Sequence, residues 1–215
     1  MKILSVNVGL PREVTWQGKL VTTGIFKEPV NGPIMLRTLN LDGDEQADLA
    51  VHGGVNKAVY VYPSEHYGYW RTELPGVDLP WGMFGENFTT EGLLEDAIYI
   101  GDRFRIGDVE VMVTEPRMLC YKLGIKFGRA DIIKRFLASR RTGFYFAVAQ
   151  EGIVGVGDAI KLIGREQQEI SVADITRLYA FARDDLQALR RAIEVETLPE
   201  NWKGYFQHQL EKQTA

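Results

Sequence analysis

The sequence predicts a mainly β protein with interspersed helices, in which a closed or nearly closed β-barrel over residues 1–165 is followed by a small three-helix unit over residues 166–215. Three observations support this fold class. Residues 1 to about 165 show short stretches of period-two alternation bounded by Gly, Pro, Asn and Asp, which is typical of many short strands. Gly-rich corners between such strands favour a barrel over a doubly wound sheet. After residues 165–169 the apolar period changes to about 3.6, which indicates helices.

Composition agrees with a globular protein. The chain has 215 residues, of which 45% are hydrophobic and 25% are charged, so it is long enough to bury its own core. The N-terminus shows no cleavage pattern, and no run approaches the roughly 18 apolar residues of a membrane span. We therefore expect a cytoplasmic protein that does not bind a membrane. The single cysteine, Cys120, excludes an internal disulfide and zinc sites built on several thiolates.

Within residues 1–165, individual strands are marked by alternation. Leu4, Val6 and Val8 share one face of the first expected strand, and the valines at 109, 111 and 113 repeat this pattern. Residues 101–107 and 157–164 each resemble a Gly-Asp turn that leads into a strand. Residues 144–149 are apolar on both faces, as in a strand buried on both sides. Helices are expected near residues 64–73 and 131–140.

Three helices are expected after residue 170. Ser171 or Asp174 can cap the first, Asp185 can open the second, and Pro199 suits the first turn of the third. Three short helices also suit a helix-turn-helix DNA reader. However, residues 171–215 contain six basic and seven acidic side chains, whereas phosphate contacts need clustered positive charge. We therefore expect this unit to cover or dock onto the barrel and to bind no nucleic acid.

Charge is distributed unevenly along the chain. Residues 117–141 contain eight basic side chains and one acidic side chain, a balance of +7, although the formal net charge of the whole chain is -4. A basic segment in an acidic protein indicates an anionic ligand. The basic residues 134, 135, 140 and 141 are more typical of the solvated face of a helix. Arg117 and Lys122, which flank Cys120, are the better functional candidates.

The lone thiol has two interpretations. Nearby positive charge favours the thiolate, which binds soft metals or attacks electrophiles. A single cysteine is also often a small buried hydrophobe. A Cys-His enzyme would need a partnered histidine, and His52 is the one in a distinctive setting, but nothing in the sequence supplies a third orienting group.

Three further stretches contain candidate ligand-binding residues. His52, Gly53, Gly54 and Lys57 form a loop whose free amides and lysine can hold an oxyanion, or which is a simple turn into a strand at residues 58–62. Asn87, next to Gly85, can contact a heterocycle or stabilise a turn. Lys27, with Lys19, Thr22 and Thr23, surrounds a strand expected at residues 20–26 and adds donors for an anion.

Taken together, four motifs resemble those of one family. They are Gly43-Asp44-x-Gln46-Ala47-Asp48, His52-Gly53-Gly54 with Lys57-Ala58-Val59-Tyr60, Gly85-Glu86-Asn87-Phe88, and Pro116-Arg117-x-x-Cys120-x-Lys122-Leu123. In this order they resemble the MOSC domain family, which is named after the C-terminal domain of molybdenum cofactor sulfurase. The chain is most similar to the bacterial YiiM-like branch of this family. The resemblance extends to the three-helix domain that follows the barrel in that branch, and it covers nearly the whole chain.

This resemblance implies a MOSC-type β-barrel with a pocket for the molybdenum cofactor, Mo-molybdopterin. Cys120 occupies the position of the molybdenum ligand, and Cys120 and His52 are the expected catalytic residues. The expected cofactor-binding residues are Lys27, His52, Gly53, Gly54, Lys57, Asn87, Arg117 and Cys120. An imidazole changes charge near neutral pH, so His52 can serve as a proton source.

The implied activity is that of a molybdenum-dependent oxidoreductase. Related proteins reduce N-hydroxylated compounds to amines, including base analogues such as 6-hydroxylaminopurine, which detoxifies them. Because the chain shows no flavin, nicotinamide or iron-sulfur motif, electrons are expected from a separate reductase. Two alternatives remain open, namely a cysteine persulfide sulfur carrier and a non-catalytic carrier of the cofactor. A homodimer is also left open.

Overall fold

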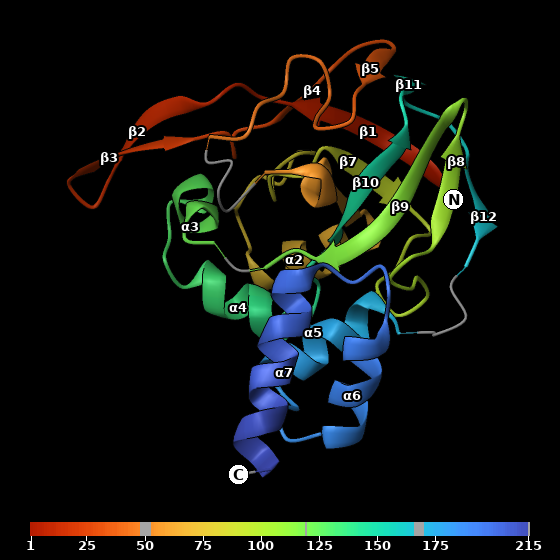
Figure 1. The fold of residues 1–215 in the computed structure, drawn as a ribbon. Helices are drawn as coiled ribbons and strands as arrows, with labels where there is room; N and C mark the ends of the chain where they lie inside the picture. The colour runs from red at the N-terminus through yellow and green to blue at the C-terminus, as the bar shows by residue number, and fades with distance from the viewer. Residues whose placement is uncertain (48–52, 119, 166–169, 215) are drawn as a thin grey trace.

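The computed structural model describes residues 1–47, 53–118, 120–165 and 170–214 (Figure 1). The strands are β1 (Lys2–Val8), β2 (Arg12–Trp16), β3 (Lys19–Thr23), β4 (Glu28–Pro29), β5 (Ile34–Leu36), β6 (Val59–Pro63), β7 (Phe88–Glu91), β8 (Arg103–Ile106), β9 (Val109–Pro116), β10 (Phe144–Gln150), β11 (Gly152–Val154) and β12 (Ile160–Gly164). The helices are the short 3₁₀ helix η1 (Val55–Lys57), α2 (Glu65–Glu73), α3 (Lys122–Phe127), α4 (Ile132–Ser139), α5 (Val172–Ala180), α6 (Leu186–Glu194) and α7 (Glu200–Thr214).

Eight strands form one curled sheet in the order β12-β8-β9-β10-β6-β7-β1-β4. Its neighbouring strands are antiparallel except for the parallel pair β6 and β7. Backbone hydrogen bonds between residues 1–3 and 157–160 connect β1 to the segment that leads into β12, and so bring the two ends of the sheet together. The predicted fold class, a barrel-like sheet with interspersed helices and three helices at the end, is confirmed.

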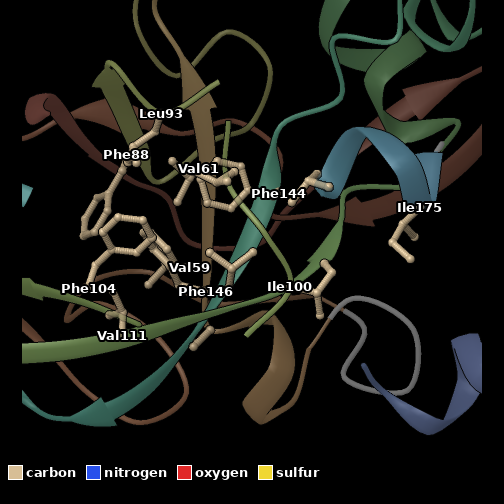
Figure 2. Packing of buried hydrophobic residues seen from close by; sticks show 14 of the residues in the cluster. Val59, Val61, Phe88, Leu93, Ile100, Phe104, Val111, Phe144, Phe146 and Ile175 are labelled. Carbon is tan, nitrogen blue, oxygen red and sulfur yellow. The ribbon is translucent and has the colours of Figure 1, made fainter. Parts of the chain in front are cut away.

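The interior of this sheet is the main core. Figure 2 shows Val59 and Val61 of β6 packed with Phe144 and Phe146 of β10 in one cluster, to which β7, β8 and β9 also contribute. The prediction that residues 144–149 are buried on both faces is wrong for the second half, because Ala149 is exposed. Beyond Phe146 the strand β10 pairs with β9 alone, so its end lies outside the covered part of the sheet.

Two strands near the N-terminus depart from the sequence expectation. In β1 the register shifts between Ile3 and Ser5, so Val6 joins Ile3 in the main core, whereas Leu4 and Val8 are only partly buried and the polar side chains of Ser5 and Asn7 are buried. The strand expected at residues 20–26 ends at Thr23. The next residue, Gly24, lies against the backbone of residue 45, where a Cβ would come within 2.5 Å of a carbonyl oxygen. This close approach directs the chain away from the β2-β3 hairpin.

Of the helices within residues 1–165, two agree with the sequence, whereas the short helices η1 and α3 were not expected. Helices α2 and α4 match the expected segments, and the basic residues 134, 135 and 140 are exposed as predicted, while Ile132 and Phe136 are buried. Helix α3 was not expected, because six residues are too few to show a helical period. It directly follows Cys120 and Tyr121.

The three C-terminal helices begin as the sequence predicts. Ser171 and Asp174 form a reciprocal capping box for α5, Asp185 caps α6, and Pro199 immediately precedes α7. Ile175, Trp202 and other apolar side chains of these helices belong to the same core cluster as the sheet interior, so the helices pack below β9 and β10 (Figure 1). The boundary between the barrel domain and the three-helix domain, placed between residues 165 and 166, stays a prediction. In the described part of the chain, no helix has the length and apolar character needed to cross a bilayer.

Candidate functional site

Most of the segments that the sequence indicates as candidates for ligand binding contribute residues to one cavity. The space between its walls is about 630 Å³, including the part that is open to solvent. Its lining includes Lys27, Asp44, Lys57, Tyr60, Asn87, Arg117, Cys120, Lys122 and Tyr145. These residues come from segments up to 118 positions apart along the chain, so the sheet is what brings them together.

One side of the cavity consists of Lys27, Asp44 and Asn87, here called the paired wall. Lys27 and Asp44 form a buried ion pair. The Asn87 amide donates to Asp44 Oδ2 at 2.8 Å, and the backbone N–H of Gly9 donates to Asp44 Oδ1 at 2.9 Å. Burial lowers the pKa of Lys27, and Asp44 opposes this shift. The polar groups of this wall therefore satisfy one another within the protein.

Asn87 also holds the backbone of the neighbouring strand. Its Oδ1 accepts from the backbone N–H of Tyr60 at 3.0 Å. The adjacent carboxylate of Glu86 is fully buried and accepts from the backbone N–H groups of Gly82 and Phe84 and from the Thr89 hydroxyl. Burial raises the pKa of Glu86, and hydrogen bonds from the Tyr67 hydroxyl, the Gly82 backbone and the Thr89 hydroxyl oppose the rise. The Asn87 side chain therefore connects separate segments of the chain rather than stabilising a turn, and its predicted ligand contact stays a prediction.

A second group of cavity-lining residues consists of Lys57, Arg117, Cys120 and Lys122, here called the cationic wall. Arg117 is only 6% exposed, and its guanidinium lies 5.0 Å from the ring centre of Tyr60 and 5.3 Å from that of Phe136. Among the described residues, no hydrogen-bond partner is found for its buried Nη1 atom. Buried polar atoms are nearly always satisfied, so Arg117, which also lines the cavity, is a candidate for a further polar contact there.

Local backbone structure fixes Arg117 and Cys120. The backbone N–H of Arg117, which directly follows β9, donates to the carbonyl of Gly143 at 3.1 Å. Gly143 has a φ of 63°, and a Cβ there would lie 2.4 Å from the carbonyl oxygen of Val61. Cys120 is half-buried, and the backbone N–H of Lys122 approaches its Sγ at 3.5 Å. The thiol therefore lies at the cavity between the end of β9 and the start of α3.

The structure brings together Lys27, Lys57, Asn87, Arg117 and Cys120 at the cavity. Gly53 and Gly54 are described but do not line the cavity. Gly54, with a φ of 95°, directly precedes η1, which ends at Lys57. His52 lies outside the described residues, so its predicted role is not tested.

Sequence reasoning did not select Asp44, Tyr60, Tyr145 and Glu115 as site residues. The sequence indicated Asp44 only through the motif that begins with Gly43 and Asp44. Glu115 carried a signal of its own, because it places a carboxylate two residues before Arg117, near the end of a strand. In the structure it is buried, and its Oε2 lies 3.9 Å from the ammonium of Lys57.

The cavity can bind a particular class of ligand. A thiolate prefers a soft metal, whereas arginine and lysine side chains prefer phosphate or other oxyanions. The cationic wall offers both kinds of group at one cavity. Tyr145, whose pKa burial raises to about 12, stays a protonated phenol near neutral pH. The arrangement therefore suits an anionic ligand that also contains a soft metal.

Comparisons with known proteins identify the family. The family model of the MOSC domain matches residues 48–161, and that of the YiiM-like 3-alpha helix domain matches residues 170–213. The chain therefore belongs to the MOSC domain family, and its C-terminal helices place it in the YiiM-like branch.

The individual relatives agree with this assignment. YflK of Bacillus subtilis (strain 168) is 40% identical over 204 residues, which cover 95% of this chain and 92% of that protein. The crystal structure of YiiM from Geobacillus stearothermophilus has 34% sequence identity and a TM-score of 0.82, with 97% of this chain and 98% of that chain covered. A protein of Gibberella moniliformis (strain M3125 / FGSC 7600) named "Reductase" is 34% identical over 196 residues, which cover 90% of this chain but 35% of that protein.

Proposed function

We propose that this protein is a molybdenum-cofactor-dependent reductase that converts N-hydroxylated compounds, including hydroxylamino purines, to amines in the cytoplasm. The observation that carries the proposal is a half-buried thiol, Cys120, in one cavity with Arg117, whose buried Nη1 has no partner among the described residues. Membership of the MOSC domain family and a relative named "Reductase" support a redox function.

The residues of the cationic wall fit Mo-molybdopterin. Its phosphate and pterin match Arg117, Lys57 and Lys122, because arginine can form paired hydrogen bonds with a phosphate and lysine adds charge. Cys120 would hold molybdenum through its thiolate. Lys27 and Asn87, which the resemblance also assigns to the cofactor, would act mainly by holding the shape of the cavity through Asp44. The bound cofactor would supply two-electron redox chemistry.

In the proposed reaction, R-NHOH, two electrons and two protons give R-NH2 and water. The N–O bond breaks, the nitrogen is reduced, and a separate reductase supplies the electrons. The protein orients the substrate beside Cys120 and supplies protons. His52 remains the proposed proton source. The buried phenol of Tyr145 stays protonated near neutral pH and lines the same cavity.

Reduction of 6-hydroxylaminopurine tests this function. Protein loaded with the cofactor and given a strong chemical reductant should form the amino purine, and Cys120→Ser should form none. Lys134→Ala, which removes an exposed lysine of the same basic segment, is the control and should keep full activity. NADH or NADPH alone should not support turnover, whereas an added flavin reductase should.

Loaded protein that leaves several N-hydroxylated substrates intact under the chemical reductant would contradict the reductase function. Sulfane sulfur on Cys120 in protein that contains no molybdenum would favour the persulfide carrier. Bound cofactor without turnover would favour the cofactor carrier.

A further inference from the structure

A second cavity lies between the β2-β3 hairpin and the region of α3 and α4, where the hairpin extends above α3 (Figure 1). The space between its walls is about 860 Å³, including the part that is open to solvent. The lining includes, from the hairpin, Trp16, Gln17, Lys19 and Val21 and, from the facing segments, Tyr121 and Ile133. The function proposed above assigns no role to these residues.

The second cavity lies next to the first at the thiol. Cys120 lines the first cavity, and the residue that follows it, Tyr121, lines the second. On the hairpin side, Thr23 lines the first cavity and Val21 lines the second. These two residues share one face of β3 and are about 6.6 Å apart along it. A molecule in the second cavity would therefore lie beside whatever Cys120 holds in the first.

The turn of the hairpin fixes the direction of Trp16. Gln17 and Gly18 form a two-residue turn with φ values of 50° and 75°, and such turns hold the two strands in one register. In this register Trp16 is directly opposite Lys19, so the two side chains lie on the same face as Val21. This face is the one that lines the second cavity.

Two aromatic rings of this cavity have no ring packed against them. The other three tryptophans, Trp70, Trp81 and Trp202, each pack against an aromatic side chain. In the described part of the chain, no such contact is found for Trp16, which is half-buried, or for Tyr121, which is 51% exposed. Flat rings stack favourably on aromatic side chains, so the two residues offer binding surfaces for a planar ligand.

We infer that Trp16 and Tyr121 form a substrate subsite for a planar nitrogen heterocycle of purine size, whose N-hydroxylated substituent extends toward Cys120. The ammonium of Lys19 and the amide of Gln17, which line the same cavity, add donors that suit the ring nitrogens of such a ligand. This inference rests on the proposed function, because it takes the first cavity as the place of reaction. The subsite would favour heteroaromatic over aliphatic hydroxylamines.

Binding of 6-hydroxylaminopurine to the cofactor-free full-length chain tests the subsite, with titration calorimetry and backbone amide shifts as readouts. Trp16→Ala and Tyr121→Ala should each raise the dissociation constant about fivefold to a hundredfold, because each removes a stacking surface. Tyr121→Phe keeps the ring and should stay close to wild type. Two controls should match wild type, namely Leu20→Ala, an exposed position of the same hairpin, and Phe181→Ala, an exposed ring outside both cavities.

Several outcomes of this titration would overturn the inference. They are wild-type protein that does not bind the purine at millimolar concentration, unchanged affinity in both alanine variants, and an equal loss of affinity in Leu20→Ala. Thermal unfolding of each variant identifies any that fails to fold. If Trp16→Ala fails to fold, Tyr121→Ala still reports, because that side chain is exposed and its removal leaves the core intact.

Kinetics of the loaded protein separate stacking from a general effect on the fold. Trp16→Ala should raise the KM for 6-hydroxylaminopurine and leave kcat nearly unchanged, because the ring contact is the same before and during the reaction. For an aliphatic hydroxylamine the same variant should keep the wild-type KM, since that substrate has no ring to stack. An equal rise of KM for both substrates would overturn the inference.

The failure of the subsite can be told apart from the failure of the proposed function. If the alanine variants lose purine binding while loaded wild-type protein reduces no N-hydroxylated substrate, the subsite stands and the reductase function fails. If loaded wild-type protein reduces 6-hydroxylaminopurine while both alanine variants bind it as tightly as wild type, the function stands and the subsite fails.

Discussion

The paired wall and the cationic wall line the same cavity but use charge differently. In the paired wall, Lys27, Asp44 and Asn87 satisfy one another with buried hydrogen bonds and an ion pair. In the cationic wall, Arg117 retains a buried Nη1 with no partner among the described residues. Buried polar groups that are paired maintain a fold, whereas those left over indicate where a ligand binds. Substitutions in the paired wall should therefore mainly reduce stability, whereas substitutions in the cationic wall should mainly reduce ligand binding.

The largest effect is expected where the backbone supports the cationic wall. Gly143→Ala should lower the free energy of unfolding by about 4 kcal/mol, because a Cβ there would meet the Val61 carbonyl and the φ of 63° is unfavourable for alanine. Gly128→Ala is the matched control, since Gly128 has a φ of 64° but open space around it, and should cost about 1 kcal/mol. Urea unfolding measures both values. Equal losses would show that the close contact does not matter.

In the paired wall, Asp44→Asn should mainly reduce stability. It leaves the buried Lys27 without its counter-charge, and breaking a buried ion pair costs about 3 kcal/mol. Asp42→Asn, which breaks the exposed pair with Arg37, serves as the control and should change little. Denaturant midpoints compare the two. If Asp44→Asn lowers the denaturant midpoint no more than Asp42→Asn does, the paired wall does not stabilise the fold as we describe.

In the cationic wall, Arg117→Met should instead reduce ligand binding. The affinity for the cofactor should fall about tenfold to a hundredfold with the loss of charge-assisted contacts. Stability should change by no more than about 1 kcal/mol, because an apolar chain can replace a buried charge. Arg135→Met, at an exposed arginine of the same basic segment, should leave cofactor binding unchanged. A large loss of stability with intact cofactor binding would contradict our account of this wall.

At neutral pH the smallest effect is expected from Lys126, whose contribution to stability appears as a pH dependence next to the paired wall. Lys126 donates to the carbonyl of Lys27, and burial lowers its pKa from 10.5 to about 8. Between these values the unfolded chain binds a proton that the folded chain does not, so this group makes the free energy of unfolding rise with pH from about 8 to 10.5. In Lys126→Met this contribution should disappear. Urea unfolding at pH 7 and pH 10 checks it, with Lys134→Met expected to keep the wild-type slope.

The sequence predicts those parts of the fold that depend on local pattern. The alternating valines of β9 are buried, and Ser171 and Asp185 cap the helices expected there. It does not predict contacts that depend on how distant strands align. Lys27 and Asp44 are 17 residues apart, and Glu115 and Trp202 are 87 apart. Such pairs form only when the curled sheet closes, so a periodicity along the chain carries no signal for them.

For the candidate site, the sequence predicted which residues lie at the cavity but not which of them are already paired within the protein. Motifs with a lone thiol and nearby cations indicated Cys120, Arg117 and Lys57, and the structure places all three at one cavity. The same reasoning treated Lys27 and Asn87 as ligand contacts, but it could not show that both would bind Asp44. Whether a polar residue is already satisfied depends on three-dimensional neighbours, and this distinction separates the two walls.

The most direct test of the account is the molybdenum and pterin content of protein expressed in a host that makes the cofactor. Wild-type protein should contain about one molybdenum per chain, since one thiol is available as the ligand. Cys120→Ser should lose molybdenum, whereas Asp44→Asn that remains folded should keep Cys120 as a ligand and retain more of the metal. Equal molybdenum in wild type and Cys120→Ser, or none in either, would contradict the assignment of the cationic wall to the cofactor.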